Sequence, residues 1–232
     1  FDQIENAFKK IKINFKKEKF NILKKFPKGK RISTKIFWNE LGISDYNCSD
    51  INKKSKMYID LNFPLKNKDL INKFDLVTDF GNNEHVFNVG QAYKNMYQLC
   101  KKNGYMWIFQ AVYGGNGFFN YDMSFFEGMA AANNLSIVYS CYLVQTTEYE
   151  QFIIPCNKDL FNVLDLTKIK SVGITYIFRK NSIENFKYYY QYNVNNNGSP
   201  FEIMYLNNEL SPEKIYVPTK KIGQLKKKRK KR

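Results

Sequence analysis

The feature that most constrains the fold is the alternation of apolar, strand-length segments with segments of helical spacing. Four apolar segments have the length and composition of buried strands: 74–79, 105–112, 135–145 and 172–179. Two segments between them, 88–102 and 124–134, are predicted helices, the first with Ala92, Met96 and Leu99 at helical spacing. Strands that alternate with helices are typical of a parallel sheet covered on both faces. The sequence therefore predicts an α/β fold with a mostly parallel sheet and helices on both faces.

The charge of the chain is concentrated at its two ends. The whole sequence carries a net charge of +16. Residues 1–35 carry +9 and residues 220–232 another +9, which leaves −2 for the residues between them. Together with the breaks in the hydrophobic pattern, this charge distribution predicts four parts: a basic amphipathic N-terminal segment (1–30), an α/β domain (31–180), an irregular C-terminal extension (181–219) and a disordered polybasic tail (220–232).

The basic ends allow two interpretations. Clustered lysines attract nucleic-acid phosphates or anionic lipids through charge alone. The alternative is compositional, because lysine, asparagine, isoleucine, phenylalanine and tyrosine abound along the whole chain and AT-rich codons encode all five. Under the first interpretation, residues 220–232 make non-specific contact with nucleic acid, without a preference for any base sequence.

Cysteine usage and hydropathy limit the location and the cofactors of the protein. None of Cys48, Cys100, Cys141 and Cys156 belongs to a Cys-x-x-Cys pair, and the lone histidine, His85, does not complete a zinc site of ordinary spacing. No run of about 18 apolar residues predicts a membrane span, and no signal-peptide pattern is visible. We therefore expect a cytoplasmic protein with reduced cysteines, no metal centre and no membrane span.

Acidic residues and a glycine lie where successive predicted strands end. Asp50 ends a short predicted strand at 46–51, and Asp60 ends another at 57–61. Asp79 ends the predicted strand 74–79, and Phe80 and Gly81 follow it. Parallel α/β sheets bind ligands at the carboxyl ends of their strands, where an acidic side chain accepts hydrogen bonds from the ribose hydroxyls of a nucleoside. Three such features in succession indicate a nucleoside-type pocket.

Two segments carry a recognisable pattern. Residues 59–65 read Ile-Asp-Leu-Asn-Phe-Pro-Leu, and residues 74–88 read Phe-Asp-Leu-Val-Thr-Asp-Phe-Gly-Asn-Asn-Glu-His-Val-Phe-Asn. This pattern resembles one bacterial group of class I methyltransferases, which reads Asp-Leu-Asn-x-Pro-Leu and then Phe-Asp-Leu-Val-x-Asp-x-Gly-Thr-x-Glu-His-Val-x-Asn. The likeness covers roughly residues 34–145, and its Glu-His-Val-x-Asn stretch is the most specific part.

The resemblance implies a Rossmann-like methyltransferase sheet and the methyl donor S-adenosyl-L-methionine as cofactor. It also implies roles for particular residues. Glu84 and His85 are implied to face the reaction centre as the catalytic pair. Five residues are implied to line the cofactor pocket: Asp50, Asp60, Leu61, Phe80 and Gly81.

The chain departs from the family pattern at two places. Family members usually have a histidine before their Gly-Phe-Tyr-Asn segment, and Asn116 stands there in this sequence. The family's first strand ends in a glycine turn that wraps the methionine end of the cofactor, whereas residues 1–30 hold only Gly29, between two lysines. We therefore expect that the first strand lies upstream of residue 1.

Each candidate site residue also has a purely structural interpretation. His85 either takes a proton from the methyl acceptor or fixes the strand-to-helix turn by hydrogen bonding. Glu84 either acts as a general base or is an acid favoured by the dipole of the following helix. Asp60 either meets the adenine amino group or caps a turn, and Asp50 either binds ribose or is a solvated loop acid.

The aromatic residues leave similar alternatives. Phe118 and Phe119 either wall a substrate pocket or pack in the core. The tyrosines at 188–190 and 192, beside basic residues, either stack nucleobases or pack in the ordinary way.

Three functions follow from these observations. The first is an S-adenosylmethionine-dependent methyltransferase that acts on an oxygen or nitrogen of a small molecule or glycan precursor. The second is a nucleic-acid methyltransferase guided by the basic ends. The third is a degenerate, non-catalytic Rossmann-like binding module. The sequence leaves the methyl acceptor and the acceptor atom open.

Overall fold

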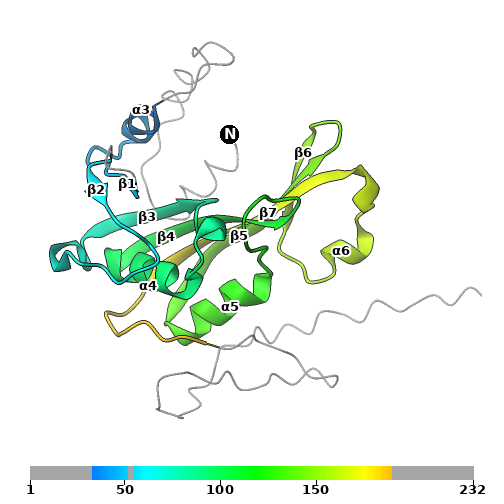
Figure 1. Cartoon of the computed structure of the whole chain (residues 1–232). Coiled ribbons are helices and arrows are strands. Elements are labelled where there is room, and N and C mark those ends of the chain that lie inside the picture. Colours follow the sequence, from blue (N-terminus) through cyan, green and yellow to red (C-terminus); the bar gives the residue numbers. More distant parts are fainter. Residues whose placement is uncertain (1–32, 52–54, 190–232) are drawn as a thin grey trace, which may run out of the picture.

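The computed structural model describes residues 33–51 and 55–189 (Figure 1). The predicted N-terminal segment (1–30), the polybasic tail (220–232) and most of the predicted extension lie outside these residues. The elements follow in the order α3 (Thr34–Glu40), β1 (Ser49–Asp50), β2 (Met57–Tyr58), η1 (Lys68–Leu70), β3 (Phe74–Phe80), η2 (Asn83–His85), α4 (Val89–Leu99), β4 (Cys100–Tyr113), α5 (Met123–Ala132), β5 (Leu135–Thr146), β6 (Gln151–Pro155), α6 (Leu160–Val163), η3 (Leu166–Lys168) and β7 (Ile169–Lys180).

The main sheet has five strands in the order β3-β4-β7-β5-β6. Only β3 and β4 are parallel, and every other neighbouring pair is antiparallel. The predicted fold is therefore wrong: this is a mixed sheet rather than a mostly parallel Rossmann-like sheet. The four α-helices of the described residues do not form the two covering layers of such a sheet.

The error has a physical cause in β7. A strand with apolar residues on both faces is typical of a parallel sheet, but any strand in the middle of a covered sheet has the same pattern. Here the chain leaves β5 through the hairpin to β6, and β7 then inserts between β4 and β5, antiparallel to both. Strand order and direction depend on this return path, which hydrophobic spacing does not report.

Helices α4 and α5 lie side by side against one face of the sheet, and α3 lies on the other side (Figure 1). On the first face, Phe126 of α5 stacks on Tyr176 of β7 with ring centres 4.9 Å apart. On the opposite face, Trp38 and Leu41 pack with Ile177, the residue next to Tyr176. Burying a large apolar side chain contributes about 1.5–3 kcal/mol, so both faces of β7 stabilise the fold.

Side-chain caps begin the two main helices. The Asn88 side chain accepts a hydrogen bond from the backbone N–H of Gln91 at the start of α4. The Asp122 side chain accepts one from Ser124 at the start of α5. Helix α4 ends earlier than the predicted 88–102 because Cys100 already pairs with Phe74 in the sheet. Both caps place helix N-termini just after strands β3 and β4.

The chain beyond β7 packs along the two helices. Phe186 is buried and lies 5.6 Å from the ring centre of Tyr97 in α4. The Asn133 side chain accepts a hydrogen bond from the backbone N–H of Lys187 and donates one to its carbonyl oxygen. Residues 181–189 therefore have defined positions, although they form no helix and only a single bridge residue.

Lys180, the last residue of β7, joins the end of α4 to the sheet. The side chain is 1% exposed, and its ammonium donates hydrogen bonds of 2.8 Å to Asn72 Oδ1 and to the carbonyl oxygens of Tyr97 and Cys100. Carbonyls at the end of a helix have no partner within the helix and carry partial negative charge. A buried cation at this position satisfies two of them.

We expect Lys180→Met to lower the free energy of unfolding by about 2–4 kcal/mol, because two buried carbonyl oxygens and the part-buried Asn72 Oδ1 lose their donor while the apolar stem is preserved. The measurement is urea denaturation at neutral pH. Lys102→Met, at an exposed position of β4, is the matched control and should change stability by less than about 0.5 kcal/mol. Equal stability of the two variants would contradict the role given to Lys180.

Candidate functional site

The site lies at the edge of the sheet where the parallel strands β3 and β4 end together. Phe80 pairs with Phe109 in register, and the backbone N–H of Gly81 donates to the carbonyl oxygen of Phe109 at 2.7 Å. Because both strands run in the same direction, the segments that follow them also lie next to each other. These segments are η2 and the glycine-rich stretch 114–117.

A buried carboxylate, Asp79, organises the turn after β3. Its Oδ1 accepts hydrogen bonds from the backbone N–H groups of Asn82, at 3.0 Å, and Asn83, at 3.3 Å. Its Oδ2 accepts a hydrogen bond from Gln110 Nε2 of the neighbouring strand. Burial raises the pKa of Asp79 to about 7, and the negative charge of Glu84 adds to this rise, although the three hydrogen bonds oppose it.

Glu84 is also buried, and it fastens the loop after β4 to the turn after β3. Its Oε2 accepts a hydrogen bond from the backbone N–H of Ala111 at 2.8 Å, and its carbonyl oxygen accepts one from Phe118 at 2.7 Å. A Cβ atom at Gly117 would lie 2.7 Å from that carbonyl oxygen, so the close approach requires glycine. Glu84 therefore holds the loop after β4 in position. Its catalytic role stays a prediction.

His85 is the neighbour of Glu84 and faces outward. Its side chain is 48% exposed, and its Nε2 lies 3.6 Å from Glu84 Oε1. The backbone N–H of His85 donates to the carbonyl oxygen of Asn82 at 3.0 Å, which closes the η2 turn. The imidazole is therefore accessible on one side and has a buried carboxylate near it on the other, at a distance too long for a hydrogen bond.

Three exposed phenylalanines belong to the segments next to His85. Phe118, which is bonded to Glu84 through its backbone, is 72% exposed, and Phe87 is 81% exposed. Phe63 is exposed as well, and its carbonyl oxygen accepts a hydrogen bond from Asn95 of α4. Phe119 instead packs against the main core. Of the two predicted wall residues, therefore, Phe118 lies beside the candidate site and Phe119 belongs to the protein interior.

The predicted cofactor residues Asp60 and Leu61 lie in a loop that α4 holds. Asp60 Oδ1 accepts hydrogen bonds from the backbone N–H and the side-chain amide of Asn62, at 3.0 and 3.1 Å, so it caps a local turn. Asn95 of α4 donates to the carbonyl oxygens of Leu61 and Phe63. Asn88, at the start of α4, donates through its backbone N–H and its side chain to Asn62. These contacts bring the loop next to the segment that carries His85.

Phe80 and Gly81 lie at the end of β3 itself. Phe80 stacks on Trp38 with ring centres 6.3 Å apart and meets Trp107 edge-on at 5.3 Å. Gly81 has a φ of +73°, and a Cβ atom added there would meet nothing within 4 Å. The turn therefore has open space in front of it and an aromatic ring beside it.

Asp50 lies apart from the main sheet. It is exposed and belongs to β1, which pairs in parallel with β2 in a separate two-stranded sheet. Its carbonyl oxygen accepts a hydrogen bond from Ser55 at 3.3 Å. Glu84, His85 and the Phe80–Gly81 turn thus lie at one edge of the five-stranded sheet, whereas Asp50 belongs to the two-stranded sheet.

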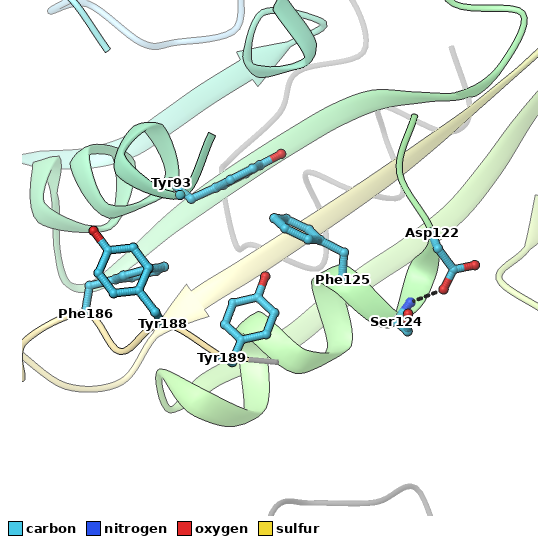
Figure 2. Close-up of a pocket in the computed structure, with 8 residues that line it drawn as sticks. Tyr93, Asp122, Ser124, Phe125, Phe186, Tyr188 and Tyr189 are labelled. Carbon is cyan, nitrogen blue, oxygen red and sulfur yellow. Dashed lines mark hydrogen bonds between the residues drawn. The ribbon is translucent and has the colours of Figure 1, made fainter. Parts of the chain in front are cut away.

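A second feature near this edge was missed by the sequence reasoning. A pocket of about 330 Å³ opens between α4, α5 and residues 186–189 (Figure 2). Its walls come mostly from aromatic residues of these three segments: Gly90, Tyr93, Asp122, Ser124, Phe125, Phe186, Tyr188 and Tyr189. The run of tyrosines at 188–190 was the available signal, but a run of one residue type does not show what it packs against.

Comparison with known proteins finds no family model, no curated protein and no solved structure that matches this chain. Within residues 33–51 and 55–189, no three His, Cys, Asp or Glu side chains cluster in a way that could hold a metal ion. In the same residues, no helix is both long enough and apolar enough to cross a membrane. The geometry of the edge is therefore the basis for a functional proposal.

The raised pKa of Asp79 predicts a pH dependence of stability. Between the ordinary aspartate pKa of 3.8 and the folded value of about 7, the folded state binds the proton more tightly than the unfolded chain does. The contribution of Asp79 to stability is therefore present below pH 4 and is lost as the pH rises toward 7. A shift of this size corresponds to at most about 4 kcal/mol.

We expect Asp79→Asn to remove this component, so that its stability relative to the parent increases between pH 4 and pH 8. The new amide can keep accepting from Asn82 and can donate to Gln110 Oε1, which has no partner among the described residues, once the Gln110 amide turns over. Denaturant unfolding across this pH range is the measurement, with Asp75→Asn on the exposed side of β3 as control. Parallel stability curves for parent and Asp79→Asn would show that Asp79 does not titrate in this range.

Proposed function

We propose that this protein is an S-adenosylmethionine-dependent methyltransferase that transfers a methyl group to an oxygen or nitrogen of a small molecule or glycan precursor. The observation that carries the proposal is the pairing of His85 with Glu84 at the carboxyl edge of the parallel strands, where the Glu-His-Val-x-Asn stretch places both residues. An accessible imidazole next to a buried carboxylate is the combination expected of a general base with an orienting partner, which supports the proposal. His85 is the sole histidine of the sequence.

The residues at this edge fit the adenosyl part of the cofactor. The open space at Gly81 leaves room for a ligand against the backbone, and the half-exposed Phe80 ring offers a flat apolar surface beside it. The loop that holds Asp60 and Leu61 is fixed by α4, so its backbone is preorganised. Asp50 lies outside this edge, exposed on β1 of the separate two-stranded sheet, and we propose its carboxylate as the ribose ligand.

When bound, S-adenosylmethionine supplies an electrophilic methyl group on a positively charged sulfur. The chain itself has to align the acceptor and remove its proton. His85 is accessible to the acceptor and can take a proton at its unprotonated ring nitrogen. Glu84, 3.6 Å from His85 Nε2, stabilises the imidazolium that forms and restrains the ring. The exposed rings of Phe118 and Phe87 would offer apolar surface to an acceptor bound there.

We expect His85→Ala to bind S-adenosylhomocysteine as tightly as the parent and to lose turnover by roughly 100- to 10,000-fold, because general-base catalysis contributes that much. The parent protein is first given a mixture of hydroxyl- and amine-bearing acceptors, and mass spectrometry identifies the methylated compound. Calorimetry then measures cofactor binding for His85→Ala. Asp50→Ala should instead weaken binding by roughly 10- to 150-fold, the loss expected for a charge-assisted hydrogen bond.

Glu148→Ala, at an exposed position on the β5–β6 connection, is the matched control for both variants and should match the parent. Full activity of His85→Ala with a lowered melting temperature would show that His85 only fixes the turn. Absence of S-adenosylhomocysteine binding by the parent protein would refute the proposal and favour a non-catalytic binding module.

A further inference from the structure

The pocket between α4, α5 and residues 186–189 has an apolar interior with aromatic walls. Tyr93 of α4 and Phe125 of α5 contribute two rings whose centres are 5.0 Å apart. Phe186 and Tyr188 line the pocket from the third segment, with ring centres 5.6 Å apart and nearly perpendicular planes. Its volume of about 330 Å³ lies within the range of small-molecule sites. Flat rings on several sides favour a planar ligand.

Two hydroxyls in this wall, those of Tyr93 and Tyr189, are buried without a hydrogen-bond partner among the described residues. The hydroxyl of Tyr189 is shielded from solvent and forms no hydrogen bond with any described residue. Figure 2 shows the Tyr189 side chain pointing toward Phe125 and Tyr93. Burial raises the pKa of Tyr189 well above its usual value, and the neighbouring Tyr121 adds to the rise, so the phenol keeps its proton. Buried hydroxyls nearly always have a hydrogen-bond partner, so a ligand with a polar group would complete this one.

The opposite end of the pocket carries negative charge. Asp122 is exposed there, with one carboxylate oxygen bonded to the Ser124 N–H at 2.8 Å. None of the residues that line the pocket is a lysine or arginine. Lys94 lies outside the lining, with its ammonium 5.6 Å from the centre of the Tyr188 ring. A carboxylate in a lining that holds no lysine or arginine disfavours anionic ligands such as phosphates and carboxylates.

We propose that this pocket binds a small planar aromatic molecule, neutral or positively charged, with a polar substituent hydrogen-bonded to Tyr189 and its opposite end near Asp122. The binding claim stands on the pocket alone. The further claim, that this molecule is the methyl acceptor, rests on the proposed function. Its structural basis is that the rings of Tyr93 and Phe125 contact Tyr121, which follows the loop that is hydrogen-bonded to Glu84.

Four related compounds probe the pocket without knowledge of the natural ligand. Tyramine has a phenol and an ammonium, tyrosol has a phenol and a neutral alcohol, para-hydroxyphenylacetate has a phenol and a carboxylate, and phenethylamine has an ammonium but no phenol. Calorimetry with the full chain should give saturable binding of tyramine and tyrosol and weaker binding of the other two. The loss of one hydrogen bond predicts that phenethylamine binds roughly 3- to 10-fold more weakly than tyramine.

Two variants assign the preferences to residues. Tyr189→Phe removes a hydroxyl that lacks a partner, so it should fold with an unchanged or higher melting temperature and should abolish the preference for tyramine over phenethylamine. Asp122→Asn keeps a helix-capping side chain and should reduce the preference for tyramine over para-hydroxyphenylacetate by roughly 2- to 5-fold. Tyr58→Phe, at an exposed position of β2, is the matched control and should leave both preferences unchanged.

A third variant tests the location. A side chain at Gly90 would approach within 3.2 Å of Tyr188, so Gly90→Leu should fill the pocket and abolish binding of all four compounds while α4 is retained in the circular dichroism spectrum. The pocket proposal is overturned if no compound binds saturably, or if Tyr189→Phe and Gly90→Leu bind as the parent does. Binding without methyl transfer would refute only the acceptor role, and methyl transfer to compounds that do not compete with tyramine would refute that role while leaving the enzymatic proposal in place.

Discussion

The insertion of β7 between β4 and β5 is the constraint on which the rest of the structure depends. Tyr176 on one face of β7 packs against α5, and Ile177 on the other packs against α3. Lys180 at the end of the strand satisfies the carbonyls at the end of α4. One strand thus positions helices on both sides of the sheet, and it does so while running antiparallel to its neighbours.

Because β7 pairs with one side of β4, only the other side of β4 is open to a further strand. The strand that pairs there is β3, and it runs parallel to β4. This single parallel pair places the turn after β3 and the loop after β4 next to each other, because both strands end at the same edge. Two buried carboxylates accept hydrogen bonds from backbone N–H groups at this edge. Asp79 holds the turn after β3, and Glu84 holds the loop after β4 while it faces His85. The same edge therefore holds two structural carboxylates and the exposed His85.

Local features of this chain could be predicted from the sequence, and longer-range features could not. The spacing around Ala92 and Met96 predicted a helix, and α4 contains both residues. The mostly parallel sheet was wrong, because apolar residues on both faces of β7 indicate burial and carry no information about direction. The pocket was missed, because Tyr93, Phe125 and Tyr189 lie far apart in the sequence and meet only when residues 186–189 pack on the helices. The roles of His85 and Glu84 stay predictions.

The central claim is that the edge formed by β3 and β4 binds the methyl donor. Hydrogen–deuterium exchange with mass spectrometry, with and without saturating S-adenosylhomocysteine, tests it most directly. The account predicts slower exchange at residues 80–87 and 111–118, with no change at β6 and α6 on the far side of the sheet. Unchanged exchange at both segments, or protection confined to residues 151–163, would contradict it.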